Sequence, residues 1–166
     1  MELINWQNKI EGDFIFSLKQ ITEKTFDITA HKWALVIANA DKGVKKNQLR
    51  NFYDKVLELE EKAINTDENE FKRKVLPFVK MLKSKVAYAK NKQTSPVNKA
   101  FELFMNNAID QIMNKEEFLN FKYLLEAIIG FYQEEEIIKP RGQVDCERSK
   151  FFIKQNKDKN CGGKKW

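Results

Sequence analysis

The residues with the clearest chemistry are the cations between positions 71 and 99. This stretch holds nine lysines and arginines and no acidic residue, whereas residues 101–138 carry eight acidic and two basic side chains. Residues 51–70 repeat the acidic excess, with seven acidic and two basic side chains. A charge distribution segregated by sign, with the aromatic Tyr88 inside the basic block, is typical of a surface that binds phosphates.

On a helical wheel, the cations of residues 71–92 fall on both flanks of an apolar stripe. Like charges at helical spacing repel by about 0.2–0.5 kcal/mol per pair, and no acid inside the block relieves them. This favours binding of a polyanion, although a solvated helix face is the ordinary interpretation of a charge run and stays open. The candidate binding residues are Lys46, Arg50, Arg73, Lys80, Lys83, Lys85, Tyr88, Lys90 and Lys92.

Two groups of cations lie where helices are expected to begin. Lys72, Arg73 and Lys74 stand near one start, and Lys45, Lys46 and Arg50 surround another. Cations at a helix N-terminus oppose the helix dipole, but they suit a site where backbone N–H groups and cations hold a phosphate together. Tyr88 falls on the outer side of the wheel, where stacking on a base and half-buried packing are both open.

The sequence offers little for catalysis or for metal binding. His31 is the only histidine, and its place at a helix start favours a capping or surface role. Cys146 and Cys161 lack the spacing of a zinc site, and the consecutive carboxylates of residues 134–136 point in different directions on a helix. Phosphate-loop and dinucleotide-binding motifs are absent from the sequence. We therefore predict no catalytic residue, no metal and no cofactor.

Composition predicts an all-α protein. Of 166 residues 42% are hydrophobic, and only nine are glycine or proline, too few for a turn-rich β-sandwich. The sequence contains no run of about 18 apolar residues, which is the length that a membrane-spanning helix needs. The first ten residues also lack the apolar core of a signal peptide. Two cysteines in a polar stretch favour reduced thiols. We expect a soluble, cytoplasmic protein with no membrane partner.

Three regions are expected along the chain: a partly helical N-terminal segment (1–28), a bundle domain (29–140) and a basic, flexible tail (141–166). Residues 139–166 contain nine basic and three acidic residues and so account for the whole net charge of +6. The domain itself is predicted to be a compact antiparallel bundle of five to six helices.

Apolar stripes at helical spacing predict the helices of the bundle. They cover about residues 30–41, 47–64, 70–92, 95–112 and 114–138. We expect Asn47, Ser95 before Pro96, and Asn114 with Glu117 to cap helix starts. Gly43 is placed to end the first helix, Pro77 should kink the third or mark its late start, and Phe78 is expected to face inward.

Three segments resemble the small subunit of the type III-A CRISPR Csm effector complex. They are NQLRNFYDKVLELE (47–60), MLKSKVAYAKNK (81–92) and FLNFKYLLEAIIGFY (118–132). The residues that carry the resemblance are Gln48, Leu49, Arg50, Phe52 and Tyr53; Leu82, Lys85, Ala87, Tyr88 and Ala89; and Phe118, Phe121, Glu126, Ala127, Ile128 and Ile129. The similarity spans about residues 29–138. Ser84, where the family often has proline, and the long basic tail depart from it.

The resemblance implies a helical bundle without catalytic activity. Copies of such a subunit stack beside the backbone subunits of a ribonucleoprotein and contact guide RNA and target RNA through basic residues. Carried over by position, Arg50, Lys83, Lys85, Lys90 and Lys92 become the leading RNA contacts. The alternative from another class is a protein–protein adaptor, whose basic face docks on an acidic partner or on a second copy of the chain.

Overall fold

The computed structural model describes residues 12–40, 43–91 and 97–138, with side chains as far as Tyr132. Within these ranges every regular element is a helix, which confirms the all-α prediction. The elements are the 3₁₀-helix η1 (Gly12–Phe14), the π-helix η2 (Thr25–Thr29), α1 (Ala30–Asn39), α2 (Lys46–Ile64), α3 (Glu68–Glu70), the π-helix η3 (Phe71–Val75), α4 (Leu76–Asn91), α5 (Lys99–Gln111) and α6 (Lys115–Ile138).

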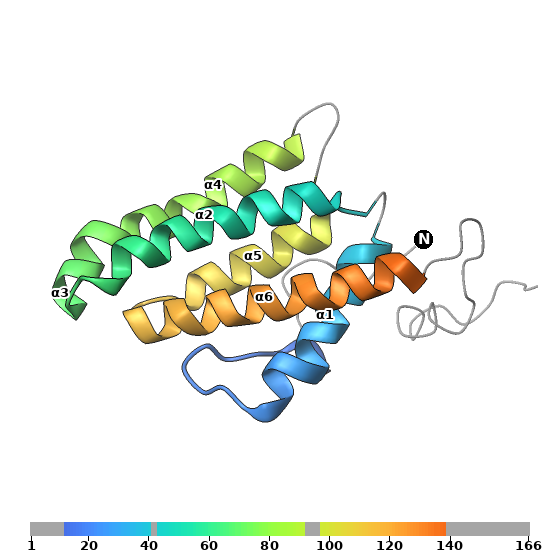
Figure 1. Ribbon diagram of the computed structural model, residues 1–166, viewed down its shortest axis with the longest axis horizontal. Coiled ribbons are helices and arrows are strands. Elements are labelled where there is room, and N and C mark those ends of the chain that lie inside the picture. Colours follow the sequence, from blue (N-terminus) through green and yellow to red (C-terminus); the bar gives the residue numbers. More distant parts are fainter. Residues whose placement is uncertain (1–11, 41–42, 92–96, 139–166) are drawn as a thin grey trace, which may run out of the picture. The chain divides into compact units, whose positions relative to one another are not determined.

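Four long helices form the bundle, and consecutive ones run in opposite directions. Helices α2, α4, α5 and α6 lie along a common direction, joined by short connections at alternating ends (Figure 1). The shorter α1 packs mainly against α6. The predicted antiparallel bundle of five to six helices is confirmed, with the three-residue α3 as the sixth.

The core is built from the apolar stripes that the sequence predicts. In α2 the buried residues are Leu49, Phe52, Val56, Leu59 and Ala63. The predicted stripes of residues 97–112 and 118–132 are buried as well. Trp33 of α1 lies at the centre of an aromatic cluster, with ring centroids 5.5 Å from Phe104 and 6.5 Å from Phe16. Burial of these side chains supplies the main driving force for folding.

Phe78 is an exception, and its predicted inward position is wrong. The side chain is 48% exposed. It stands at the edge of the buried stripe of α4, beside a groove that α2 lines with Leu59 and with charged side chains. The Lys62 amine lies over the ring, 5.7 Å from its centre, but leaves about half of the side chain exposed.

Helix ends show which predicted caps form. Asn114 accepts a hydrogen bond from the Glu117 N–H through Oδ1 at 2.8 Å, as predicted. Asn47 is not a cap, because α2 begins one residue earlier and its N-cap is Lys45, which makes no side-chain capping bond. The predicted cap at Ser95 and Pro96 lies outside the described residues. Helix α5 begins at Lys99, with Asn98 as its N-cap.

The region around Pro77 is one helical stretch interrupted by a π-turn. Asp67 caps α3, accepting a hydrogen bond from the Glu70 N–H at 2.8 Å, and η3 leads without a loop into α4. Proline lacks an N–H group and its ring crowds the carbonyl four residues earlier. The wider π-turn η3 ends at Val75 and accommodates this conflict. The α-helix α4 begins at Leu76, directly before Pro77, which agrees with the late start that the sequence predicted.

The chain from η1 to residue 24 has little regular structure, yet it is fixed to the bundle by hydrogen bonds from polar side chains. Gln111 Oε1 accepts from the Leu18 N–H at 2.9 Å, and Asn120 Nδ2 donates to the Leu18 carbonyl at 2.9 Å. Trp33 Nε1 donates to the Phe14 carbonyl at 3.1 Å. These bonds satisfy backbone groups that the bundle buries. The predicted regions before residue 12 and after residue 138 lie outside the described residues.

Asn98 joins α5 to α1, and we expect its replacement to cause a measurable loss of stability. Its Oδ1 accepts from the Phe101 N–H at 2.9 Å, while Nδ2 donates to the carbonyls of Ile37 and Ala40 at 2.7 and 3.1 Å. We expect Asn98→Ala to lower the free energy of unfolding by about 1–3 kcal/mol, because it removes a cap and leaves carbonyls unpaired. Urea unfolding followed by circular dichroism measures this. Asp67→Ala, at an exposed cap, is the matched control and should cost less.

Candidate nucleic-acid interface

The predicted binding residues are spread over the bundle. Lys46 and Arg50 lie on the first turns of α2, Arg73 lies in η3, and five residues lie on α4: Lys80, Lys83, Lys85, Tyr88 and Lys90. Lys92 lies outside the described residues. Helix α2 begins at the end of the bundle where α4 finishes, whereas η3 lies at the opposite end (Figure 1). The 19 residues of α2 span about 28 Å, so Arg73 and Lys46 do not share one binding site.

On the flank of α4 that faces α5, the lysines already have partners. Lys83 Nζ lies 2.7 Å from Asp110 Oδ1, and Lys90 pairs with Glu102. Both acids belong to α5, which begins at Lys99, where the basic block ends. The inference that no acid relieves the repulsion within this block is therefore wrong, because folding supplies acids from a neighbouring helix.

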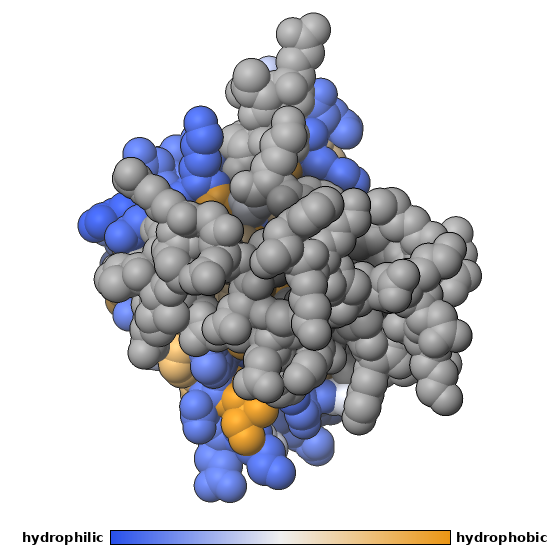
Figure 2. Space-filling view, turned by 90° about the vertical axis from the view of Figure 1, so that its right-hand side faces the viewer, coloured by the Kyte–Doolittle hydropathy of each residue, from blue (hydrophilic) through white to orange (hydrophobic). Residues whose placement is uncertain are grey.

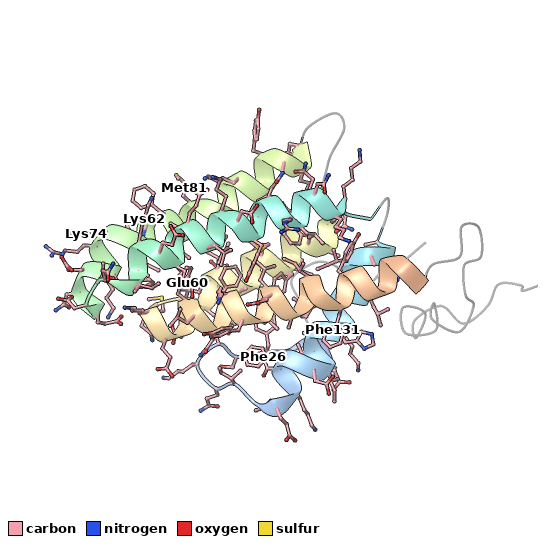
Figure 3. The ribbon with its side chains drawn as sticks, viewed as in Figure 1. Phe26, Glu60, Lys62, Lys74, Met81 and Phe131 are labelled. Atoms are coloured by element: carbon pink, nitrogen blue, oxygen red, sulfur yellow. The ribbon has the colours of Figure 1, made fainter. Side chains whose placement is uncertain are left out.

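Two further lysines of the block pair with acids of α3. Lys74 Nζ lies 2.6 Å from Glu70 Oε1, and Lys72 Nζ lies 3.7 Å from Glu68 Oε1. Figure 3 shows Lys74 at the end of the bundle formed by α3. Exposed pairs of this kind contribute about 0–1 kcal/mol to stability, but they reduce the positive potential of the surface.

Lys80 has a structural role at the end of α5. Its Nζ donates to the Ile109 carbonyl at 2.6 Å and lies 3.4 Å from the Asp110 carbonyl, at the C-terminus of α5. A cation at a helix C-terminus binds the carbonyls that have no partner within the helix. Burial lowers the pKa of Lys80, with the nearby Asp110 opposing that effect. An amine held in this way is poorly placed to reach a phosphate.

At the start of α2, the predicted cations remain without acidic partners among the described residues. Lys45, Lys46 and Arg50 are exposed, and no ion pair forms at any of them within the ranges the structure describes. The first turn of α2 contains no acid, and its N-cap residue makes no side-chain capping bond. Lys46 and Arg50 stand four residues apart, so they share one side of the helix.

The two remaining candidates on α4, Tyr88 and Lys85, differ in surroundings. Tyr88 is 69% exposed and lies on the outer side of α4, as the wheel indicated. Lys85 lies in the groove between α2 and α4, beside Lys55 and Lys62 of α2. Those two lysines were missed in the sequence because they sit in a segment with an acidic excess. Their seven-residue spacing, which repeats one side of a helix, was the signal that could have found them.

Figure 2 views the end of the bundle where α2 begins and α4 finishes. The described residues visible there are mostly hydrophilic, with a small hydrophobic patch low in the view.

The apolar motif residues of α2 and α6 that carry the sequence resemblance lie in the core of the bundle. Leu49 and Phe52 of α2 are buried, as are Phe118 and Phe121 of α6. Tyr53 meets Glu126 of α6: burial first, and then a hydrogen bond to this carboxylate, raise the pKa of Tyr53 to about 12. Lys122 lies nearby, 3.4 Å from Glu60, which Figure 3 shows between α2 and α6.

The pKa of Tyr53 leads to a pH-dependent prediction. The pKa of Tyr53 in the folded protein, about 12, exceeds the ordinary value of 10.0 that applies in the unfolded chain. The contribution of the neutral Tyr53 side chain to the stability of the fold is therefore present in full below pH 10 and is lost as the pH rises through 12. A titration of tyrosinate absorbance, with Tyr53→Phe subtracted, should show a midpoint near 12. Glu126→Gln should shift that midpoint only part of the way back, since burial is the larger cause. A midpoint near 10 in the folded protein would contradict the contact.

A metal-binding cluster does not form in the part of the chain that the structure describes. No group of three or more His, Cys, Asp or Glu side chains there converges on a possible metal site. His31 stacks against Phe131, with ring centroids 4.9 Å apart. The sequence-predicted acids at 134–136 and both cysteines lie outside the described side chains. Among the described helices, none is long and apolar enough to span a membrane.

The family model described as Csm2 Type III-A matches residues 20–136 of the chain. The chain therefore belongs to this family, the small subunit of the type III-A CRISPR complex, as the sequence resemblance predicted. No curated protein and no solved structure matches the chain.

Membership of the family carries two general properties. The small subunit is a structural, non-catalytic component of the effector complex. It also associates with the other subunits of that complex.

Proposed function

We propose that this chain is a non-catalytic RNA-binding subunit, which contacts the guide RNA–target RNA duplex through its phosphates. Its protein partners are the backbone and other subunits of the complex and further copies of itself. Contacts with phosphates position a protein on a duplex without reading its sequence, which suits a subunit that must accept any guide.

The start of α2 carries this proposal. Lys45, Lys46 and Arg50 gather there around an N-terminus that no side chain caps. This arrangement does not stabilise the helix, because cations oppose the dipole by about 0.3–1 kcal/mol each. It does provide backbone N–H groups and positive charges that can hold one or two phosphates.

The other predicted cations can be ranked as RNA contacts by the protein groups that already bind them. Lys85 and Arg73 are exposed and make no ion pair within the described ranges, so they remain proposed contacts. Lys83 and Lys90 must first give up Asp110 and Glu102, whose negative charges also repel a phosphate. Lys80 comes last, since it binds the carbonyls at the end of α5. Tyr88 remains a proposed stacking partner for a base.

A salt titration tests the RNA-binding proposal. Phosphate contacts release counterions, so the logarithm of the binding constant for an RNA duplex should fall linearly with that of the salt concentration. The expected slope is about 0.7–0.9 for each phosphate neutralised. Fluorescence anisotropy with two duplexes of unrelated sequence measures the slope and should show little sequence preference. A binding constant that hardly changes between low and physiological salt would contradict phosphate contact.

The protein should also retain RNA during purification. We expect a raised ratio of absorbance at 260 nm to that at 280 nm, which falls after a high-salt wash. A salt-sensitive oligomer free of nucleic acid would instead support the adaptor alternative.

A further inference from the structure

The groove between α2 and α4 exposes apolar side chains at the surface. Phe78 and Met81 of α4 are 48% and 45% exposed, and Leu59 and Leu82 lie deeper. Figure 3 shows Met81 and Lys62 on the two helices that form the groove. Large apolar side chains gathered in a hollow mark an interaction surface more often than single exposed ones do.

Cations border this apolar floor. Lys55, Lys62 and Lys85 line the groove together with one acid, Glu58. Lys55 Nζ lies 2.5 Å from Glu58 Oε1, which accounts for one charge of each sign. Lys62 Nζ lies 5.7 Å from the centre of the Phe78 ring, and Lys85 makes no ion pair within the described ranges. The groove therefore presents a net charge of about two positive units around an apolar floor.

The pKa of Glu58 is lowered by all three lysines of the groove. The hydrogen bond from Lys55 is the largest cause that lowers the pKa of Glu58, and Lys62 and Lys85 lower it further from a greater distance. One carboxylate thus lies within the field of three lysines from two helices. A partner that brings further carboxylates would complete the neutralisation.

The spacing of the lining residues fits a helix. On α2 they recur at positions 55, 58, 59 and 62, and on α4 at positions 78, 81, 82 and 85. Both rows follow the i, i+3, i+4, i+7 pattern of a helix face that packs on another helix. Each row spans about 10 Å along its axis, which corresponds to two turns of a third helix lying in the groove.

We propose that this groove binds an acidic amphipathic helix of another protein subunit of the complex. Apolar side chains of that helix pack on Phe78 and Met81, and its carboxylates pair with Lys62. The proposal depends on membership of the family's complex and is independent of RNA contact at the start of α2. A nucleic acid fits the groove less well, because a phosphate backbone gives Met81 nothing apolar to pack against.

Photo-crosslinking in the assembled complex tests the occupant. The full chain carries p-benzoylphenylalanine in place of Met81 and is co-expressed with the remaining subunits and a guide RNA. After irradiation, mass spectrometry should identify a crosslinked segment of another subunit with acidic and apolar residues at helical spacing. The same probe in place of Met113, which is 60% exposed outside the groove, is the matched control. A crosslink to RNA, to a second copy or to a non-acidic segment, or no crosslink above the control, overturns the proposal.

Substitutions give a second, independent measurement. We expect Phe78→Ser with Lys62→Glu to reduce incorporation of the chain into the complex at least about tenfold, since interface anchors carry most of the binding energy. The control pair is Ile15→Ser with Lys19→Glu, which makes the same chemical changes at exposed positions outside the groove. Circular dichroism of each free variant verifies its fold. Equal incorporation of both pairs would contradict the groove. Because both pairs change the net charge of the chain equally, any fall in RNA affinity should be similar for the two.

Discussion

Replacing Phe104 by alanine is expected to lower the free energy of unfolding by about 3–5 kcal/mol, the range for large core aromatics. Phe104 is fully buried in α5. Its ring lies 5.5 Å from that of Trp33 in α1 and 5.7 Å from that of Phe16 in the N-terminal segment. Truncation therefore opens a cavity where three separate parts of the chain meet, and the rigid surrounding rings cannot close it.

Urea unfolding followed by circular dichroism measures this loss. Since domains of this size are stable by about 5–15 kcal/mol, the variant should unfold at a much lower urea concentration. The matched control is Phe78→Ala, the same substitution at a half-exposed position, which should cost less than about 1 kcal/mol. Similar losses at both positions would show that burial does not distinguish them and that Phe104 is not a centre of the core.

Helical periodicity predicted the core well because burial repeats with the helix itself. The stripe of α2 from Leu49 to Ala63 is buried as predicted. The same reasoning failed at Phe78, because the wheel of one helix does not show what the neighbouring helix places opposite. Helix starts were harder for a similar reason: the Asn98 cap is also fixed by carbonyls of α1, which the local sequence does not reveal.

Charge in the sequence predicted cationic helices but not which cations remain available. Asp110 and Glu102 lie in the acidic region that the sequence contrasts with the basic block, and folding brings them beside Lys83 and Lys90. Segregation along the chain therefore does not persist on the folded surface at α5. Lys46 and Arg50 escape this neutralisation, because no acid of the described residues pairs with them.

The interface prediction with the largest expected effect concerns Lys46 and Arg50, the cations without acidic partners in the part of the chain that the structure describes. Lys46→Ala with Arg50→Ala should weaken binding of an RNA duplex by about 30- to 100-fold at low salt, because two charge-assisted contacts with phosphate are lost. The slope of the salt dependence should fall by about 1.4–1.8, or 0.7–0.9 for each contact. Lys83→Ala with Lys90→Ala removes the same net charge and should weaken binding less than about fivefold, since those lysines already pair with Asp110 and Glu102.

Measuring the melting temperature of each variant distinguishes loss of RNA contact from loss of the fold. Cations at the N-terminus of α2 oppose its dipole, so Lys46→Ala with Arg50→Ala should leave the melting temperature unchanged or slightly raised while RNA affinity falls. An indirect effect through unfolding would lower both together. If the two double variants weaken RNA binding equally, the protein binds RNA through its overall field and the start of α2 is no special site. If neither variant weakens it, the RNA contact lies elsewhere on the chain.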